Sequence, residues 1–397
     1  MSGWKNVREI SLHAFLLSII LGAISVLSFA PSAHAQKIPK YKIDPSWPKE
    51  LPNNWIMGNA PALAIDKDDH IWIMHRPRQV AKDDAALLDD PPGAMCCTPA
   101  PSILEFDAQG NILKSFGGPN FVPDWPVMEH GLFIDGEGHL WIGGNYQSGG
   151  GAALTANIPK PKDPKLGDRQ VLKLDQDGKV LLEIGHPSAA PMNNQDTSIL
   201  GSPSEFFVDD LAHEIYIADG YLNHRVVVFD SETGAFKRGW GAYGIPLSEI
   251  DNGKAAPYDP ATPSKQFRGV MSSIDISDDG KVYVGDRGGD RIQIFTKEGK
   301  FITEFIIAPN TLGNGSVWST MFSRDKAQKY LYVSDGENNV IHILTRADGK
   351  EVGTIGHKGR EPGEFDSCER MGLDSKGNLY VTEVNHNTRI DKFVPVK

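Results

Sequence analysis

Short runs of β-branched and aromatic residues, separated by polar turn residues, recur along most of the chain. The clearest example is the stretch from Gly201 to Gly241, in which four such runs follow one another. These residues favour the pleated, half-buried surface of a β-sheet, and no run has the length or the period of a helix. The stretch therefore predicts a four-stranded antiparallel sheet.

The same pattern is found six times in the sequence. Besides the Gly201 copy, its first two runs lie at Ala62–Met74, Gly131–Ile142, Ser273–Val284, Thr320–Val333 and Met371–Val381. Five of the six copies continue into a third run, at Ile103–Phe106, Val171–Leu174, Val226–Phe229, Ile292–Phe295 and Ile341–Leu344. The fourth runs are Ile112–Phe116, Val180–Ile184, Phe236–Trp240, Phe301–Phe305 and Glu351–Ile355. Repeats of roughly 40 residues with four strands each are typical of propellers, so the sequence predicts an all-β fold, a six-bladed β-propeller around a central channel.

The sixth copy is one strand short. After Tyr380 and Arg389–Phe393 the sequence ends, whereas Tyr41–Ile43 near the beginning belongs to no copy. We expect Tyr41–Ile43 to pair with Arg389–Phe393 as the outer strand of the last blade. This pairing would close the ring and leave no long unpaired sheet edge.

The first residues have the pattern of a secretory signal peptide. Lys5 and Arg8 precede an apolar run from Ala14 to Leu27, and Ala33 and Ala35 occupy the two positions that a signal peptidase reads. We therefore expect a signal peptide at residues 1–35, a propeller at residues 36–397, and a periplasmic or secreted product. A retained membrane anchor is the alternative, although the run is short for a span of roughly 20 apolar residues. No membrane association is expected after cleavage.

The formal net charge of −11 bears on partners. It argues against a nucleic-acid groove, which needs clustered Lys and Arg.

The three cysteines do not form a disulfide framework. Cys96 and Cys97 are adjacent, and Cys368 stands alone. In an oxidising compartment a vicinal Cys96–Cys97 bond is one interpretation, and two free thiols in a loop are the other. Of the pairings available, we expect Cys96 with Cys97 rather than either residue with Cys368.

The long connections are expected to lie at one end of the blades. Strand order places the tight Asp/Gly turns at one end and nearly every insertion at the other. The insertions are Pro77–Pro101, Gly117–Glu129, Gly143–Arg169, Gly185–Ser202 and Ala242–Val270. Loops this long in a compact domain are usually functional or disordered, so this end, where the channel opens, is the expected binding face.

Three blades are expected to direct a polar side chain at the channel axis. Counting back equally from the turn glycine of each inner strand gives His130, Ser272 and Glu369. A carboxylate close to His130 would favour the charged imidazolium. A histidine at such a position is also commonly a hydrogen-bonded structural residue.

The second strands end at the same face and add further candidates. Arg76 and Arg287 would bring fixed positive charge, which suits a carboxylate because guanidinium binds it in a fork, and Tyr221 would bring a phenol. Surface salt bridges are the alternative for the arginines. The aspartates at these ends are read as turn residues that bond their own backbone; they are Asp219, Asp286 and Asp335.

Several motifs resemble a known family. Asp-Gly-Tyr-Leu-Asn-His-Arg-Val-Val-Val-Phe-Asp in the third copy and Asp-Arg-Gly-Gly-Asp-Arg-Ile-Gln-Ile-Phe in the fourth resemble NHL repeats. Together with Ile-Met-His-Arg, Cys-Cys-Thr-Pro-Ala-Pro and Glu-His-Gly-Leu, they make all six blades resemble the secreted bacterial propellers related to peptidyl-α-hydroxyglycine α-amidating lyase. The resemblance implies an NHL-type propeller.

In that lyase, three axial histidines bind zinc, a tyrosine and arginines handle a hydroxyglycine substrate, and the products are a peptide amide and glyoxylate. By resemblance, His130 matches the first zinc ligand, Tyr221 the catalytic tyrosine, and Arg76 and Arg287 the arginines. The second zinc histidine is replaced by Met271 or Ser272, depending on the placement of a one-residue gap. The third is replaced by Glu369, and an aspartate that helps to bind calcium is replaced by Arg370.

These departures define three functional interpretations. The first is a secreted, lyase-like propeller with a degenerate zinc site at His130 and Glu369, which binds a small anionic or peptide-derived, carboxylate-bearing ligand at the channel mouth. In this interpretation zinc is weak or absent, because one His and one Glu fall short of the usual three ligands, and calcium is not expected. The second is an active lyase-type enzyme with an altered metal site. The third is a protein-interaction propeller, ranked lowest because the insertions contain few aromatics, chiefly Phe121, Trp125 and Tyr146.

Overall fold

The computed structural model describes residues 38–147, 163–253, 255 and 257–396. The predicted signal peptide at residues 1–35 lies outside the described residues. None of the helices in the described part has the length and apolar character needed to cross a bilayer.

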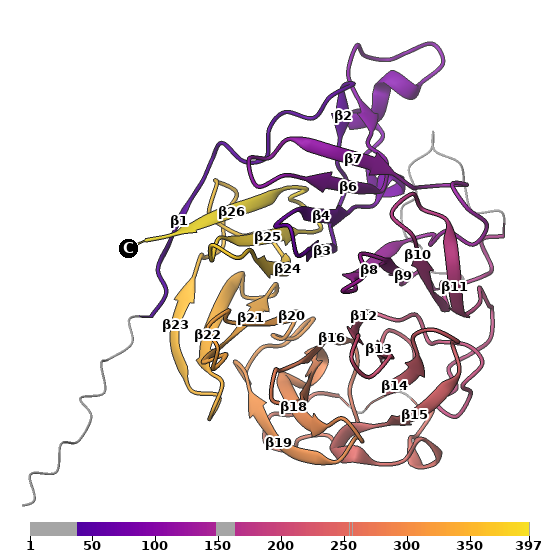
Figure 1. Ribbon diagram of the computed structural model, residues 1–397, viewed down its shortest axis with the longest axis vertical. Coiled ribbons are helices and arrows are strands. Elements are labelled where there is room, and N and C mark those ends of the chain that lie inside the picture. Colours follow the sequence, from indigo (N-terminus) through magenta and orange to yellow (C-terminus); the bar gives the residue numbers. More distant parts are fainter. Residues whose placement is uncertain (1–37, 148–162, 254, 256, 397) are drawn as a thin grey trace, which may run out of the picture. The chain divides into compact units, whose positions relative to one another are not determined.

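The described chain is a six-bladed β-propeller, as predicted, with six antiparallel four-stranded sheets arranged in a ring (Figure 1). Blade one consists of β3 (Ala62–Ile65), β4 (Ile71–Met74), β6 (Ile103–Phe106) and β7 (Ile112–Phe116). Blade two consists of β8 (Glu129–Ile134), β9 (Leu140–Gly144), β10 (Gln170–Leu174) and β11 (Val180–Gly185). Blade three consists of β12 (Glu205–Asp209), β13 (Glu214–Asp219), β14 (Arg225–Asp230) and β15 (Phe236–Trp240). Blade four consists of β16 (Met271–Ile276), β17 (Lys281–Asp286), β18 (Arg291–Thr296) and β19 (Phe301–Ile306). Blade five consists of β20 (Ser319–Phe322), β21 (Tyr330–Asp335), β22 (Val340–Thr345) and β23 (Glu351–Ile355). Blade six consists of β24 (Cys368–Leu373), β25 (Leu379–Glu383), β26 (Ile390–Pro395) and, as its outer strand, β1 (Tyr41–Ile43).

The ring closes through the N-terminal strand. β1 pairs antiparallel with β26, with Tyr41 opposite Pro395 and Ile43 opposite Phe393. Flanking backbone bonds extend the pairing, since the amide of Asp44 donates to the carbonyl of Lys392 over 2.8 Å. The predicted closure is confirmed, although β26 continues to Pro395 and the pairing lies nearer the end of the chain than expected.

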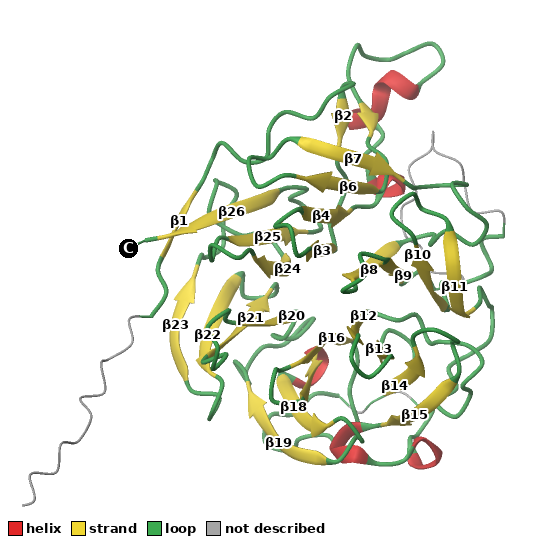
Figure 2. Cartoon of the chain, viewed as in Figure 1, coloured by secondary structure: helices red, strands yellow, loops and turns green. Residues whose placement is uncertain are grey.

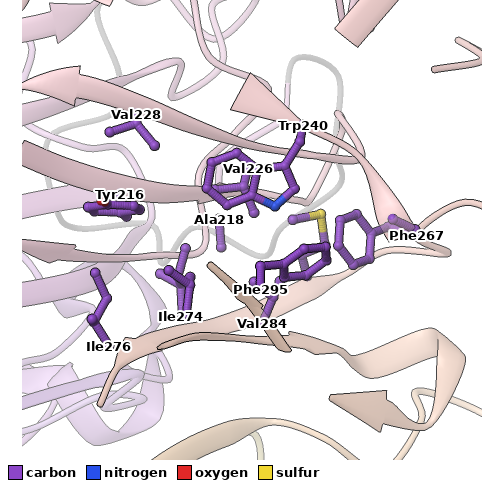
Figure 3. Packing of buried hydrophobic residues seen from close by; sticks show 13 residues of the cluster. Tyr216, Ala218, Val226, Val228, Trp240, Phe267, Ile274, Ile276, Val284 and Phe295 are labelled. Carbon is purple, nitrogen blue, oxygen red and sulfur yellow. The ribbon is translucent and has the colours of Figure 1, made fainter. Parts of the chain in front are cut away.

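Each blade is buried on both faces because successive side chains of a strand point to opposite sides. In blade three, Tyr216 and Ala218 pack toward blade four, and Ile215 and Ile217 pack toward blade two. Figure 3 shows the cluster between blades three and four, where Tyr216 lies opposite Ile276 and Trp240 lies over the blade-four side chains. Two-sided burial explains why the runs in the sequence are almost continuously apolar.

Few residues lie outside the blades in regular structure (Figure 2). The first long insertion carries the short helices η1 (Pro77–Gln79) and η2 (Asp83–Leu88), and its strand β5 (Thr98–Pro99) pairs in parallel with β2 (Trp55–Ile56). The remaining short helices are η3 (Ala242–Gly244), η4 (Leu247–Glu249) and η5 (Arg287–Gly289).

The cysteines follow the expected pairing. Cys96 and Cys97 form a disulfide, and Cys368 is a buried free thiol.

Candidate functional site

The inner strands of blades two, four and six are irregular at the positions predicted to face the axis. Their pairing with the second strands shifts register at His130 in β8, at Ser272 in β16 and at Glu369 and Arg370 in β24. The corresponding pairs of blades one, three and five, all within the described chain, show no shift. Because a β-bulge re-aims side chains, alternate blades present their first residues differently from the others.

Five predicted site residues line one pocket of about 170 Å³ at the channel mouth. His130 and Glu369 come from the inner strands, Arg76 follows β4, Tyr221 follows β13, and Arg287 follows β17. The residues that the sequence analysis selected at strand ends thus lie in one pocket, although they are up to 293 residues apart in the chain, from Arg76 to Glu369.

The remaining predicted axial residues turn away from this pocket. The Ser272 hydroxyl donates to the carbonyl of Val317 over 2.5 Å, and Met271 is fully buried in the core between blades three and four. Neither alternative for the second zinc histidine of the lyases therefore offers a ligand atom to the pocket.

Sequence reasoning missed several lining residues, among them Asn145, Asn314 and Trp318. Asn145 follows β9 and could have been found, since it occupies in its own blade the strand-end position that Arg76 and Arg287 occupy in theirs. Trp318 lies in the connection before β20, where no pattern in the sequence distinguished it.

His130 and Tyr221 form a hydrogen bond whose direction is fixed by the surroundings. The His130 Nδ1 atom lies 2.8 Å from the Ser204 carbonyl oxygen, which only accepts, so Nδ1 carries the hydrogen. In a neutral ring Nε2 then accepts, and the Tyr221 hydroxyl, 2.7 Å away, donates to it. The Tyr221 oxygen is left with lone pairs that can accept from a ligand.

The charge on His130 differs from the expectation. Burial lowers the pKa of His130 well below its ordinary value, and the positive charges of Arg76 and Arg370 act in the same direction. The expected imidazolium is therefore wrong. The Glu369 carboxylate, 3.9 Å from Nε2, does not outweigh the desolvation and the two arginines.

The two arginines at the mouth are held differently. Arg76 is buried, and its Nε donates to the carbonyl of Glu129 over 2.6 Å while its Nη2 donates to Asn145 over 3.3 Å. The Arg287 guanidinium lies 4.8 Å from the Trp318 ring centroid and makes no hydrogen bond to any residue that the structure describes. Arg76 is thus a fixed structural charge, and Arg287 is the charge available to a ligand.

Glu369 is a buried acid within this positive surround. Its side chain is 4% exposed. Burial raises the pKa of Glu369, and Arg370, Arg287 and Arg76 oppose that rise. Within the described part of the chain no group donates a hydrogen bond to its carboxylate.

Arg370, which is not among the residues lining the mouth pocket, pairs with a second buried acid. Its guanidinium contacts the carboxylate of Glu205 and donates from Nη2 to the Ser204 carbonyl over 3.3 Å. Burial raises the pKa of Glu205 to about 7, although Arg370 acts in the opposite direction. A side-chain cation therefore occupies an acidic environment at the position where the lyases, by resemblance, carry a calcium-binding aspartate.

The turn interpretation of the strand-end aspartates holds for Asp335, whose Oδ1 accepts from the backbone amide of Asn338 over 2.8 Å. It does not hold for Asp219 and Asp286, which accept from backbone amides 18 residues away in the chain. All three also have a basic side chain as partner. Asp219 accepts from Arg225 Nε over 2.8 Å, Asp286 accepts from Arg291 Nε over 2.9 Å, and Asp335 lies 3.3 Å from His342 Nε2. Each joins the end of a second strand to the start of the third. The repeated Asp-to-basic spacing of the sequence is explained by these ties.

The long insertions contribute less to the pocket than expected. Asn145 is the one described lining residue that falls in any of them. Among their aromatics, Trp125 and Tyr146 are each 5% exposed, and Phe121 is 41% exposed. Strand ends rather than insertions build the mouth, because the inner and second strands are the parts of each blade closest to the axis (Figure 1).

The donors at the mouth do not fit a zinc centre of the three-histidine type. His130 Nε2 is engaged by Tyr221, and among the described residues Glu369 is the one carboxylate that lies within 4 Å of it. In the described ranges, the one group of three metal-ligating side chains within reach of one another is Asp66, His70 and Glu105 of blade one, none of which lines the mouth pocket. Catalytic zinc usually has three protein ligands and one open position.

Comparisons with known proteins agree with the NHL and lyase resemblance. No protein-family model matches the chain. Peptidyl-glycine α-amidating monooxygenase B of Xenopus laevis is 27% identical over 266 residues, which are 66% of this chain and 25% of that protein. A probable peptidyl-α-hydroxyglycine α-amidating lyase of Caenorhabditis elegans is 24% identical over 245 residues, covering 60% of this chain and 56% of the relative.

NHL repeat-containing protein 3 of Homo sapiens is 22% identical over 390 residues, covering 93% of this chain and 88% of that protein. The chain spans about a quarter of the length of the amidating monooxygenases that it matches. Among solved structures, virginiamycin B lyase from Staphylococcus aureus superposes with a TM-score of 0.50 at 12% identity, covering 90% of this chain and 100% of that one, which shows a shared fold. The chain is thus a six-bladed β-propeller whose relatives include NHL repeat proteins and peptidyl-α-hydroxyglycine α-amidating lyases.

Proposed function

We propose that this chain is a lyase-like propeller that binds a small, carboxylate-bearing ligand at the channel mouth and lacks the zinc centre of the lyases. The observation that carries the proposal is Arg287. Its guanidinium lies over Trp318 at the pocket and forms no hydrogen bond within the described chain. An oriented guanidinium with free donors suits a carboxylate, which it binds with two parallel hydrogen bonds.

The surroundings support the same ligand class. Arg76 adds a second positive charge to the pocket wall, and stacking on Trp318 limits the orientations of Arg287 before a ligand arrives. Preorganisation of this kind reduces the entropic cost of binding. The pocket volume of about 170 Å³ lies below the 300–1,000 Å³ typical of drug-sized ligands, which favours a small molecule or the end of a peptide.

The absence of a lyase-type zinc is proposed from the chemistry of the donors. One imidazole whose free nitrogen already accepts from Tyr221 and one carboxylate make two ligands at most. Serine is a poor neutral ligand and methionine prefers soft metals, so neither residue at the second position compensates.

Binding of N-acetylglycine, followed by calorimetry, tests the proposal against its uncharged amide. We expect N-acetylglycine to bind and the amide not to bind. Arg287→Gln should weaken the binding by about tenfold to a hundredfold, as expected for a lost charge-assisted pair. Arg346→Gln is the matched control. It also removes one guanidinium, which directly follows β22 and pairs with Asp279, and this variant should bind N-acetylglycine with normal affinity. Equal affinity for acid and amide would contradict the proposal.

A second candidate, lyase-type catalysis, is favoured by the His130–Tyr221 hydrogen bond. The Tyr221 hydroxyl lies within hydrogen-bond reach of an imidazole nitrogen, which is the geometry that general acid–base catalysis by a tyrosine requires. Incubation with a peptidyl-α-hydroxyglycine and detection of glyoxylate tests this candidate. We expect no cleavage above background, whereas cleavage abolished by Tyr221→Phe would promote the enzyme over the binding protein.

We also propose that residues 1–35 direct the chain to the periplasm or outside the cell. N-terminal sequencing of the mature protein recovered from that compartment should begin after Ala35.

A further inference from the structure

Glu369 has no part in recognition of a carboxylate, yet it faces the same pocket. Its side chain is 4% exposed, and no described residue donates a hydrogen bond to it. Its nearest basic neighbour is His130 Nε2 at 3.9 Å, and that nitrogen is occupied by the Tyr221 hydroxyl hydrogen. A buried carboxylate without a donor is costly and needs an explanation.

The arginines of the site do not supply this donor. None of the Arg76, Arg287 and Arg370 guanidinium groups forms an ion pair with Glu369 in the described chain, and Arg370 is committed to Glu205. The same pocket is therefore lined by a carboxylate and a guanidinium that do not pair with each other. A pair of unjoined opposite charges is complementary to a molecule that carries both signs.

Tyr221 adds to the acceptor side. Because its hydrogen is directed at His130 Nε2, its oxygen can only accept from a molecule in the pocket. Glu369 and Tyr221 together offer two acceptors, and Arg287 offers donors.

We propose that the ligand is a small zwitterion, with α-amino acids the simplest members of the class, whose ammonium group lies between Glu369 and Tyr221 and whose carboxylate lies on Arg287. This inference rests on the proposed function and adds the cationic half of the ligand to it. A plain carboxylate would leave Glu369 desolvated and add a like charge beside it. A divalent metal would find at Glu369 one carboxylate and an imidazole nitrogen that is already in use.

Three probes of similar size separate the two halves of the site: L-alanine, propionate and ethylamine. On the unmodified protein, calorimetry should show alanine binding at least about tenfold tighter than propionate, the effect of one charge-assisted hydrogen bond. Ethylamine should bind more weakly than alanine. This comparison needs no variant and so does not depend on the folding of one.

Glu369→Gln should lower the affinity for alanine by at least about tenfold and leave propionate unchanged or tighter, because a negative charge is removed. Glu137→Gln is the control, since Glu137 lies in the exposed turn after β8 and its side chain is 75% exposed. Thermal unfolding of each variant checks that it is folded.

The outcomes distinguish the two claims. Propionate that binds as tightly as alanine, or alanine binding that survives Glu369→Gln, overturns the zwitterion and keeps the carboxylate site. Failure of N-acetylglycine, alanine and propionate alike overturns the proposed function and this inference with it. Stoichiometric zinc held by His130 and Glu369 also overturns the inference.

Discussion

The buried ion pair between Arg370 and Glu205 allows a quantitative test of how the channel is held together. Arg370 is 5% exposed and Glu205 is 8% exposed, and the two side chains come from blades six and three. Arg370→Met retains most of the side-chain length and removes the charge. Removing one partner of a buried pair leaves the other uncompensated, which typically costs about 3–5 kcal/mol of unfolding free energy.

The unfolding free energy that Arg370→Met loses should depend on pH. Burial already raises the pKa of Glu205 to about 7 against an ordinary value of 4.5, and the guanidinium opposes this rise. Without Arg370 the pKa of Glu205 should rise further, so the folded variant keeps a proton that the unfolded chain releases. Between these two pKa values the folded state binds more protons, and stability falls as pH increases. Asp275, whose pKa burial raises to about 6 while Arg370 opposes the rise, contributes with the same sign.

Urea unfolding followed by tryptophan fluorescence, at about pH 5 and about pH 8, measures this loss. We expect Arg370→Met to be much less destabilising at the lower pH, where Glu205 is protonated. The double variant Glu205→Gln/Arg370→Met should recover about 1–3 kcal/mol relative to the single variants added together. Arg360→Met, whose side chain is 69% exposed and paired with Asp366, should cost less than about 1 kcal/mol. Two results would refute the reasoning: single-variant losses that simply add up in the double variant, or a loss of unfolding free energy for Arg370→Met below about 1 kcal/mol at about pH 8.

Three further expectations concern closure, the cysteines and the metal. Deleting residues 36–46 unpairs β26 and should lower the melting temperature by several degrees. About 2 kcal/mol of hydrogen bonding is lost with the two flanking backbone bonds alone, from the Asp44 amide to the Lys392 carbonyl and from the Val396 amide to the Lys40 carbonyl. An unchanged melting temperature would contradict the closure. Non-reducing peptide mapping should recover Cys96 linked to Cys97, and a peptide that joins either to Cys368 would show another pairing. Metal analysis of purified protein should find well under one equivalent of zinc, whereas stoichiometric zinc that His130→Ala removes would favour the enzyme.

Much of the fold follows from local sequence. Alternation along each strand, such as Ile215 and Ile217 against Tyr216 and Ala218, assigns opposite faces to two neighbouring blades, and this assignment is local to the strand. The orphan strand at Tyr41–Ile43 predicted the closure because a four-stranded repeat must be completed. Counting strand ends also found Arg76, Tyr221 and Arg287, since residues at equivalent positions of a repeat lie at equivalent places around the axis.

Other properties of the site depend on residues that only the fold brings together. The bulges of β8, β16 and β24 decide which axial side chains reach the pocket, and they turn Ser272 toward a backbone carbonyl of the next blade. The neutral state of His130 follows from burial and two distant arginines, which no local pattern contains. Sequence alone thus determined the number, order and closure of the blades, because each is set by local alternation and repetition. Tertiary structure decided the charges and hydrogen-bond directions of the mouth, because desolvation and partners such as Tyr221, 91 residues from His130, exist only in the folded ring.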